Sequence, residues 1–245
     1  MANWSDPRMV GAPPAAVGTG SRDVAYDAGL RSYMLSVYNY MASGVLLTGI
    51  VALLFAQSGF AQEIMGGPGL TKYLIIFSPL AFVLAMNFGL NRMSTGTLQI
   101  LFWGFTVVMG LSMSTIFLVY TGTSIAQTFF ATAAAFAGLS LWGYTTKKDL
   151  SGFGTFLIMG LVGLLVAMII NIFLKSTAMG YAISFIGVLL FAGLTAYDTQ
   201  KIKSMYSYVA GTEMMGKTVI MGALSLYLDF INMFQFLLSF MGSRD

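Results

Sequence analysis

Two aspartates near the end of the sequence carry its strongest chemical signal. Asp229 lies in the middle of the apolar stretch 219–241, and Asp198 follows the apolar stretch before it. A charged side chain at the centre of a bilayer costs roughly 2.5 to 3.5 kcal/mol on insertion scales, so an acid at that depth is by default a functional-site hypothesis. Two acids on successive helices can share a proton, bind a cation or hold a gate shut.

The composition indicates a membrane protein. Of 245 residues, 57% are hydrophobic and 9% are charged, whereas soluble domains have about 25% charged residues. The sequence has no cysteine and no histidine, which excludes disulfides, thiolate or imidazole metal sites, and Ser-His or Cys-His nucleophile pairs. We therefore expect an all-α integral membrane protein that is not an enzyme and binds no cofactor tightly.

Charged residues divide the chain into seven stretches that can each cross the membrane. A helix needs about 20 largely apolar residues to span a hydrocarbon core of about 30 Å. Residues 1–30, rich in Gly, Ala and Pro, are predicted to form a flexible tail, and residues 31–245 a single transmembrane domain, a seven-helix bundle. The predicted spans are 37–57, 73–90, 97–120, 125–144, 152–174, 178–197 and 219–241.

The distribution of basic residues predicts the orientation, because cytoplasmic loops retain Lys and Arg. With the N-terminus in the cytoplasm, nine basic residues lie on the cytoplasmic side and three on the other. We therefore expect a cytoplasmic N-terminus and an exported C-terminus. This topology explains the net charge of +3 without a nucleic-acid partner. The nine are Arg8, Arg22, Arg31, Arg92, Lys147, Lys148, Lys201, Lys203 and Lys217, and the three are Lys72, Lys175 and Arg244.

A polar stripe accompanies Asp229 along the last span. Asn232 and Gln235 follow Asp229 at intervals of three, which sweeps about 120° of a helix surface. Because polar groups in contact with lipid are unfavourable, this stripe should face the bundle interior or a wet cavity. The alternative is that the amides and the acid only form hydrogen bonds to neighbouring helices.

Asp198 has two possible roles. It can form an interfacial ion pair with Lys201 or Lys203, at spacings of three and five. Alternatively it lies against Asp229, where two carboxylates within a few ångströms cannot both ionise easily and the pair retains a proton towards neutral pH. A shared proton would then latch the helices together. Loss of this proton would make them repel and open the site to a cation, with calcium a candidate because it prefers oxygen ligands.

The depths of Asp198 and Asp229 in the membrane decide between these two roles. With straight helices that end at the predicted boundaries, Asp198 and Asp229 are offset by roughly 15 to 18 Å at 1.5 Å per residue. The two acids meet only if the sixth helix continues beyond its predicted end, or if the seventh begins near Leu224.

Several short motifs, in order, resemble one known family. They are Tyr197-Asp198-Thr199-Gln200, then the sequence LYLDFIN at 226–232, with GYTTKKDL at 143–150 and the segment 114–120 before them. Together they resemble the Bax inhibitor motif family of multi-pass membrane proteins, in particular its bacterial members, over about 31–242.

The resemblance implies a seven-helix fold with a central last helix, and a pH-sensitive calcium leak across the bacterial inner membrane. In that family an aspartate pair on the sixth and seventh helices senses protons, and these positions match Asp198 and Asp229. An arginine on the second helix latches the closed state, and Arg92 is the candidate here. The alternative for Arg92 is an ordinary anchor on the cytoplasmic side. The expected partners are the lipid bilayer, calcium and protons.

Two other classes of function are consistent with the same residues. One is a non-transporting regulator that binds membrane proteases or other membrane proteins, as resemblance to bacterial relatives suggests. The other is an intramembrane aspartyl protease, which also uses two acids in neighbouring spans. Asp229, however, follows Leu226, Tyr227 and Leu228, where such a protease has Gly-x-Gly.

Overall fold

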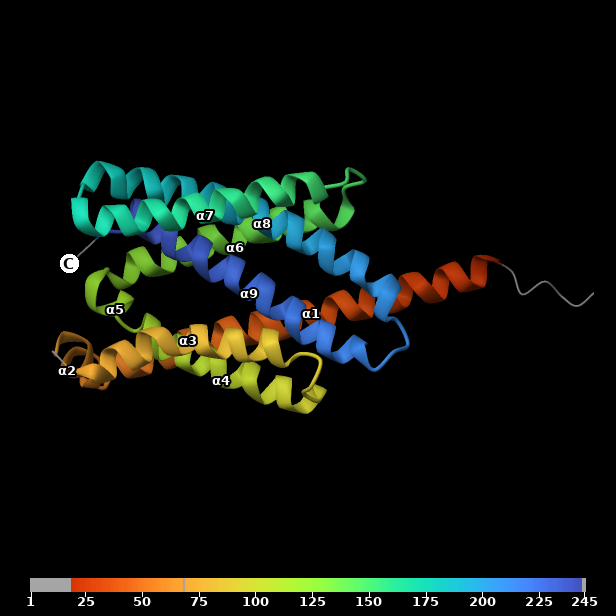
Figure 1. The fold of residues 1–245 in the computed structure, drawn as a ribbon, viewed down its shortest axis with the longest axis horizontal. Helices are drawn as coiled ribbons and strands as arrows, with labels where there is room; N and C mark the ends of the chain where they lie inside the picture. The colour runs from red at the N-terminus through yellow and green to blue at the C-terminus, as the bar shows by residue number, and fades with distance from the viewer. Residues whose placement is uncertain (1–18, 68, 244–245) are drawn as a thin grey trace, which may run out of the picture.

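The computed structural model describes residues 19–67 and 69–243. Over these residues the chain is helical, because a bilayer provides no water for backbone groups and a helix satisfies them within one segment. The helices, labelled in Figure 1, are α1 (Thr19–Gln57), α2 (Phe60–Gly66), α3 (Leu70–Gly89), α4 (Thr95–Met113), α5 (Ile116–Val119), α6 (Gly122–Thr145), α7 (Ser151–Leu174), α8 (Thr177–Val209) and α9 (Met214–Met241).

Seven helical segments in the described part of the chain are long and apolar enough to cross a membrane. The third of them combines α4 and α5, and α2 is a short helix outside the set. α1 begins at one end of the bundle and α9 finishes at the other (Figure 1), as an odd number of crossings requires. The predicted all-α, seven-helix membrane fold is confirmed.

Three predicted boundaries differ from the structure by five residues or more. α1 begins at Thr19, so residues 19–30 of the predicted tail are helical, while residues 1–18 lie outside the described residues. α8 continues well past residue 197, to Val209, and α9 already begins at Met214. Hydropathy finds where charges begin, but charged residues are good helix formers and a helix can continue out of the lipid.

The third predicted span is interrupted. Ser114 and Thr115 separate α4 from α5, and the Ser114 hydroxyl donates to the Leu111 carbonyl at 2.7 Å. Ser and Thr hydroxyls compete in this way for helix carbonyls. The span therefore ends in a separate short turn of helix.

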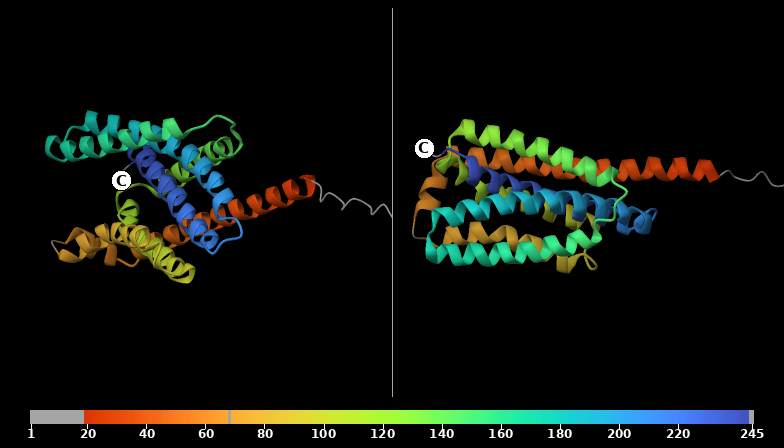
Figure 2. Two further views of the ribbon diagram at one scale, coloured as in Figure 1. Left: turned by 45° about the vertical axis from the view of Figure 1, so that its right-hand side comes forward. Right: turned by 90° about the horizontal axis from the view of Figure 1, so that it is seen from above.

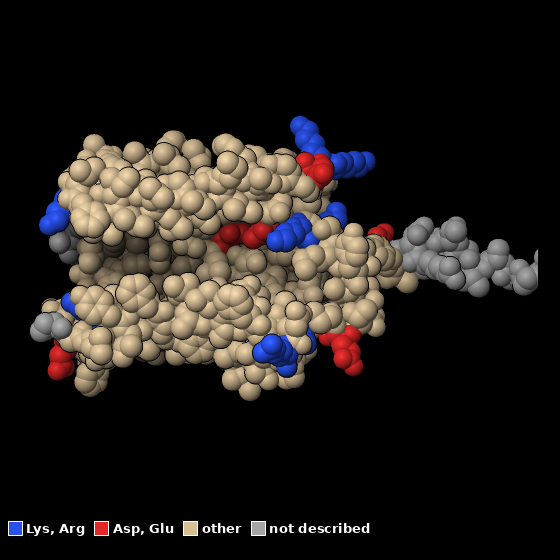
Figure 3. Space-filling model, viewed as in Figure 1, with Lys and Arg blue, Asp and Glu red and all other residues tan. Residues whose placement is uncertain are grey.

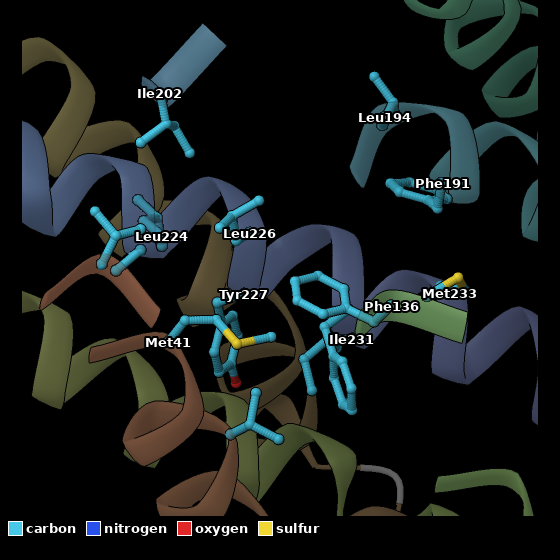
Figure 4. Packing of buried hydrophobic residues seen from close by; sticks show 14 of the residues in the cluster. Met41, Phe136, Phe191, Leu194, Ile202, Leu224, Leu226, Tyr227, Ile231 and Met233 are labelled. Carbon is cyan, nitrogen blue, oxygen red and sulfur yellow. The ribbon is translucent and has the colours of Figure 1, made fainter. Parts of the chain in front are cut away.

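α9 is the central helix of the bundle. In its most apolar window 67% of the residues are buried, against 11% to 33% in the other six spans. α9 runs obliquely between one group formed by α6, α7 and α8 and another formed by α1, α3 and α4 (Figures 1 and 2). Side chains from α1, α6 and α8 surround it (Figure 4), among them Met41, Phe136 and Phe191. The expectation of a central last helix is thus confirmed.

Candidate functional site: two aspartates between the last two helices

Asp229 lies in the interior of α9, surrounded by protein. Its side chain is 4% exposed, and its Oδ2 atom has no hydrogen-bond partner among the described residues. Burial of a carboxylate without a compensating bond is strongly unfavourable, more so than burial of a neutral amide. An ordinary packing role therefore accounts poorly for an acid at this position.

Asp198, on α8, is the titratable group among the described residues that acts electrostatically on Asp229. Asp198 is eleven residues from the end of α8 at Val209, and Asp229 is fifteen residues from the start of α9 at Met214. At about 1.5 Å per residue, the depths of the two acids in these antiparallel helices differ by roughly 6 Å. The longer helices remove the offset expected from the predicted boundaries and bring the two acids to similar depth.

The extension of α8 has a signal in the sequence that hydropathy misses. Thr195, Thr199, Ile202 and Tyr206 are all buried, and their spacings of four, three and four place them on one helix face. The Thr199 hydroxyl donates to the Thr195 carbonyl at 2.7 Å, so its polar group is satisfied within the helix. This face packs on the bundle while the opposite face carries the charges.

The two lysines near Asp198 make other contacts. Lys203 Nζ donates to the Tyr144 carbonyl at 2.7 Å and lies 4.8 Å from the centre of the Tyr144 ring. Lys201 acts electrostatically on Asp198, but its Nζ lies over the Tyr197 ring at 5.9 Å from the centroid. Neither lysine forms a salt bridge with Asp198 within the described part of the chain. Figure 3 shows acidic side chains in the hollow between the two helix groups, with basic ones beside them.

Arg92 lies apart from the two acids. It is exposed in the turn after α3, where its backbone N–H donates to the Gly89 carbonyl. It makes no contact with Asp198 or Asp229 in the structure. The latch role of Arg92 stays a prediction.

Asn232 and Gln235 line a cavity of about 480 Å³ between α7, α8 and α9. The Asn232 amide donates to the Leu228 carbonyl of its own helix at 2.7 Å. Ser184 of α8 bonds to Ser239 of α9 at the same cavity. Asn232 and Gln235 of the stripe therefore face a mostly apolar cavity that contains a few polar groups, on the C-terminal side of Asp229, which itself does not line it.

Motifs that are far apart in the sequence meet around α8. Gln200 accepts a hydrogen bond from the Leu150 N–H at 2.9 Å and donates to the Lys148 carbonyl at 2.8 Å, which holds the connection between α6 and α7. Gly143 lets α6 approach α8 so closely that a Cβ atom there would meet the Ala196 backbone. The segments 143–150 and 197–200 therefore form one structural unit.

The sequence profile of the family described as "Inhibitor of apoptosis-promoting Bax1" matches residues 30–245. The chain belongs to this Bax inhibitor family. The match includes both acids, the stripe and the contacts of α8 with the connection between α6 and α7. The resemblance inferred from short motifs is thus confirmed over nearly the whole chain.

Bacterial proteins of similar length resemble this Bax inhibitor family member. One from Rickettsia prowazekii is 48% identical over 227 residues, which is 92% of this chain and 95% of the relative. One from Caulobacter vibrioides is 47% identical over 231 residues, 91% of this chain and 92% of the relative. The Escherichia coli inner membrane protein YbhL is 45% identical over 219 residues, 89% of this chain and 94% of the relative.

One buried hydrogen-bonded group of this Bax inhibitor family protein has no signal in the sequence. The Tyr227 hydroxyl bonds to the Thr48 hydroxyl at 2.6 Å, and Thr48 donates to the Thr106 carbonyl at 2.8 Å. These contacts join α9 to α1 and α4. Tyr227 lies in the motif that carries Asp229, but its partners are far away in the sequence, so no local pattern reveals them.

Proposed function

We propose that the protein is a pH-sensitive leak channel for cations, calcium among them, in which the Asp198–Asp229 pair controls opening. The observation that supports this most is the buried Asp229 Oδ2 atom without a hydrogen-bond partner, in range of a second acid. A side chain in that state changes its interactions when a proton or a cation arrives. In this proposal the Asp198–Asp229 pair acts as the gate of a channel and not as an enzyme active site.

The sign of the pH response follows from charge repulsion. When the pair holds a proton, one carboxyl can donate to the other and α8 stays against α9. When both are ionised, they repel and the helices separate, which admits a cation. Lys201, which acts on Asp198 from the same helix, offsets part of this repulsion. Flux should therefore rise as pH rises.

The polar groups in the cavity beyond Asp229 support a route for the ion. Amide and hydroxyl oxygens of Asn232, Gln235 and Ser239 line it, and calcium prefers oxygen ligands. Within the described ranges no group of three or more acidic side chains could hold a metal ion. Two carboxylates would bind calcium loosely, which suits conduction because a permeating ion must also leave.

The proposal also includes an orientation of the protein in the membrane. The end of the bundle that carries Arg92, Lys148 and Lys217 would face the cytoplasm, because cytoplasmic loops retain basic residues. The name of the Escherichia coli relative supports the bacterial inner membrane as the location. Arg92, exposed on that side, would latch the closed state by moving towards Asp198.

Calcium flux into liposomes tests the proposal. Purified protein in liposomes loaded with a calcium-sensitive dye should give a flux that increases with pH. Asp229→Asn, which mimics the protonated acid, should reduce flux to near the protein-free level at every pH, and Asp198→Asn should abolish the pH response. The absence of calcium flux through purified wild-type protein at every pH would refute the proposal.

Asp149 provides a matched control. It is an exposed acid in the connection between α6 and α7, and hydrogen bonds from the side chain and backbone of Ser151 lower the pKa of its carboxyl. Asp149 is therefore ionised throughout the neutral range and loses its charge only well into the acid range. Asp149→Asn should leave the flux and its pH response unchanged. An equal loss in this variant would point to a general charge effect.

The two alternatives predict different results with the same preparations. A regulator of other membrane proteins should retain partner binding when both acids are changed to Asn. A protease should cleave a membrane-spanning peptide and lose this activity with either change. We expect no cleavage by the wild-type protein.

A further inference from the structure

A long apolar groove opens on the bundle, separate from the cavity at Asn232 and Gln235. α1 and α6 form its walls, and Phe230 of α9 lies between them. The groove has a volume of about 660 Å³ and is lined almost entirely by apolar side chains, within the range of about 300 to 1,000 Å³ typical of ligand pockets. Both walls pack against α9, so an occupant would contact the helix that carries Asp229.

The length of the groove matches one leaflet. On α1 it is lined from Arg31 to Leu46, and the fifteen steps between these residues span roughly 22 Å at 1.5 Å per residue. One leaflet contributes about 15 Å of hydrocarbon and the headgroup region several ångströms more. A phospholipid with its headgroup near Arg31 would therefore have its acyl chains beside α1 as far as Leu46. A second apolar cavity of about 300 Å³ shares Val45 and Phe230 with the groove and continues towards the other face.

The polar groups of the groove gather near its end at Arg31. Arg31 is exposed at the mouth, and none of its contacts with described residues is a hydrogen bond or an ion pair. Lys203 adds a second cation at Tyr144, another lining residue. Two turns deeper, the Tyr38 hydroxyl of α1 bonds to the Ser140 hydroxyl of α6 at 2.6 Å. Arg31 at the mouth, Lys203 beside the lining residue Tyr144, and the apolar walls below match the order of groups in an anionic phospholipid.

We infer that this groove binds one anionic phospholipid, with its phosphate at Arg31 and its acyl chains between α1 and α6. Basic pockets between membrane helices on the cytoplasmic side bind anionic headgroups in this way. The charge at the mouth distinguishes this site from the rest of the lipid-facing surface, where lipids can bind whatever the charge of their headgroup. The inference does not depend on the leak activity, because binding is measured without flux.

Lipid binding to the purified full-length chain in detergent tests the inference. Native mass spectrometry with phosphatidylglycerol and with phosphatidylcholine of the same acyl chains should give one bound phosphatidylglycerol at concentrations where phosphatidylcholine binds several-fold less. Arg31→Gln should weaken phosphatidylglycerol binding about fivefold, the factor expected for one basic side chain near an anionic headgroup. Lys147→Gln is the matched control, because it removes one exposed charge from the same end of the bundle, outside the groove.

Two substitutions test the apolar part of the site. Ala42 and Ala137 are exposed groove residues on α1 and α6, so a larger side chain there fills the groove without entering the core. Ala42→Phe and Ala137→Phe should each reduce binding of both lipids at least tenfold, with an unchanged unfolding temperature.

Four results would overturn the inference. Equal binding of the two lipids would remove the role of charge, and equal weakening by Arg31→Gln and Lys147→Gln would indicate attraction by the whole basic surface. Unchanged binding in both Phe variants would place the lipid elsewhere. A dimer that Ala137→Phe abolishes would identify a second copy of the chain as the occupant.

Discussion

Tyr227 and Asp229 show how two buried polar residues on one helix acquire different roles. They are two positions apart on α9 and therefore about 200° apart around its axis. The Tyr227 hydroxyl is bonded to Thr48 of α1, whereas the Asp229 Oδ2 atom has no partner within the described chain. We infer that the Tyr227 face anchors α9 to its neighbours. In the proposed gating mechanism, the Asp229 face would respond to a proton without loss of that anchor.

Removal of the Tyr227 hydroxyl should destabilise the bundle moderately. Tyr227→Phe loses the bond to Thr48, but Thr48 keeps its bond to the Thr106 carbonyl. The free energy of unfolding should therefore fall by about 0.5 to 1.5 kcal/mol, towards the lower end in a membrane protein. Unfolding in mixed micelles with increasing denaturing detergent measures this. Tyr181→Phe, at an exposed tyrosine of α8, is the control, and an equal effect of both would contradict an anchoring role.

At the scale of helices, the contact between α6 and α8 holds Asp198 in place. Gly143 lies directly against the Ala196 backbone, two residues before Asp198. Ser140, one turn earlier on α6, bonds to the Thr199 hydroxyl at 2.9 Å. α8 is thus fixed on both sides of Asp198, and the depth of that acid depends on this contact.

A methyl group at Gly143 should separate the two helices. Backbone atoms of Ala196 cannot move aside as a flexible side chain can, so Gly143→Ala should lower the free energy of unfolding by about 1 to 3 kcal/mol. Gly138→Ala on the same helix has no heavy atom within 4 Å and should be neutral or stabilising by up to about 1 kcal/mol. The same detergent titration measures both. A stable Gly143→Ala variant would show that α8 can shift outward freely.

At the scale of the whole molecule, the charges lie mainly at one end of the bundle, around the connections α3–α4, α6–α7 and α8–α9. Outside the hollow between the two helix groups, the middle of the face in Figure 3 shows almost no charged side chains. The opposite end has few charged residues, with Lys175 in the turn between α7 and α8. This asymmetry is the physical basis of the proposed orientation.

The absence of cysteine from the sequence allows a direct test of this orientation. Lys148→Cys and Lys175→Cys each introduce one thiol at an exposed position on opposite ends of the bundle. In intact cells a membrane-impermeant maleimide should label Lys175→Cys and spare Lys148→Cys, and permeabilisation should expose both. The reverse labelling would invert the topology.

Much of the site could be predicted from the chain alone. The membrane class follows from composition, and the number of spans from the spacing of charges. Asp229 is recognisable because a single acid interrupts an apolar stretch. The end of α8 was predicted wrongly because hydropathy responds to Lys201 and Lys203, whereas the buried face of Thr199, Ile202 and Tyr206 keeps the helix intact.

The sequence by itself determined which residues are chemically exceptional and that they must lie within a membrane, because desolvation acts on each side chain wherever the helices pack. Only the tertiary structure decided which groups face one another. It placed Asp198 at the depth of Asp229, left Arg92 exposed and away from both, and opened a groove beside α9 with Arg31 at its mouth. These relations depend on helix ends and on contacts between distant segments, which the periodicity of a single stretch does not contain.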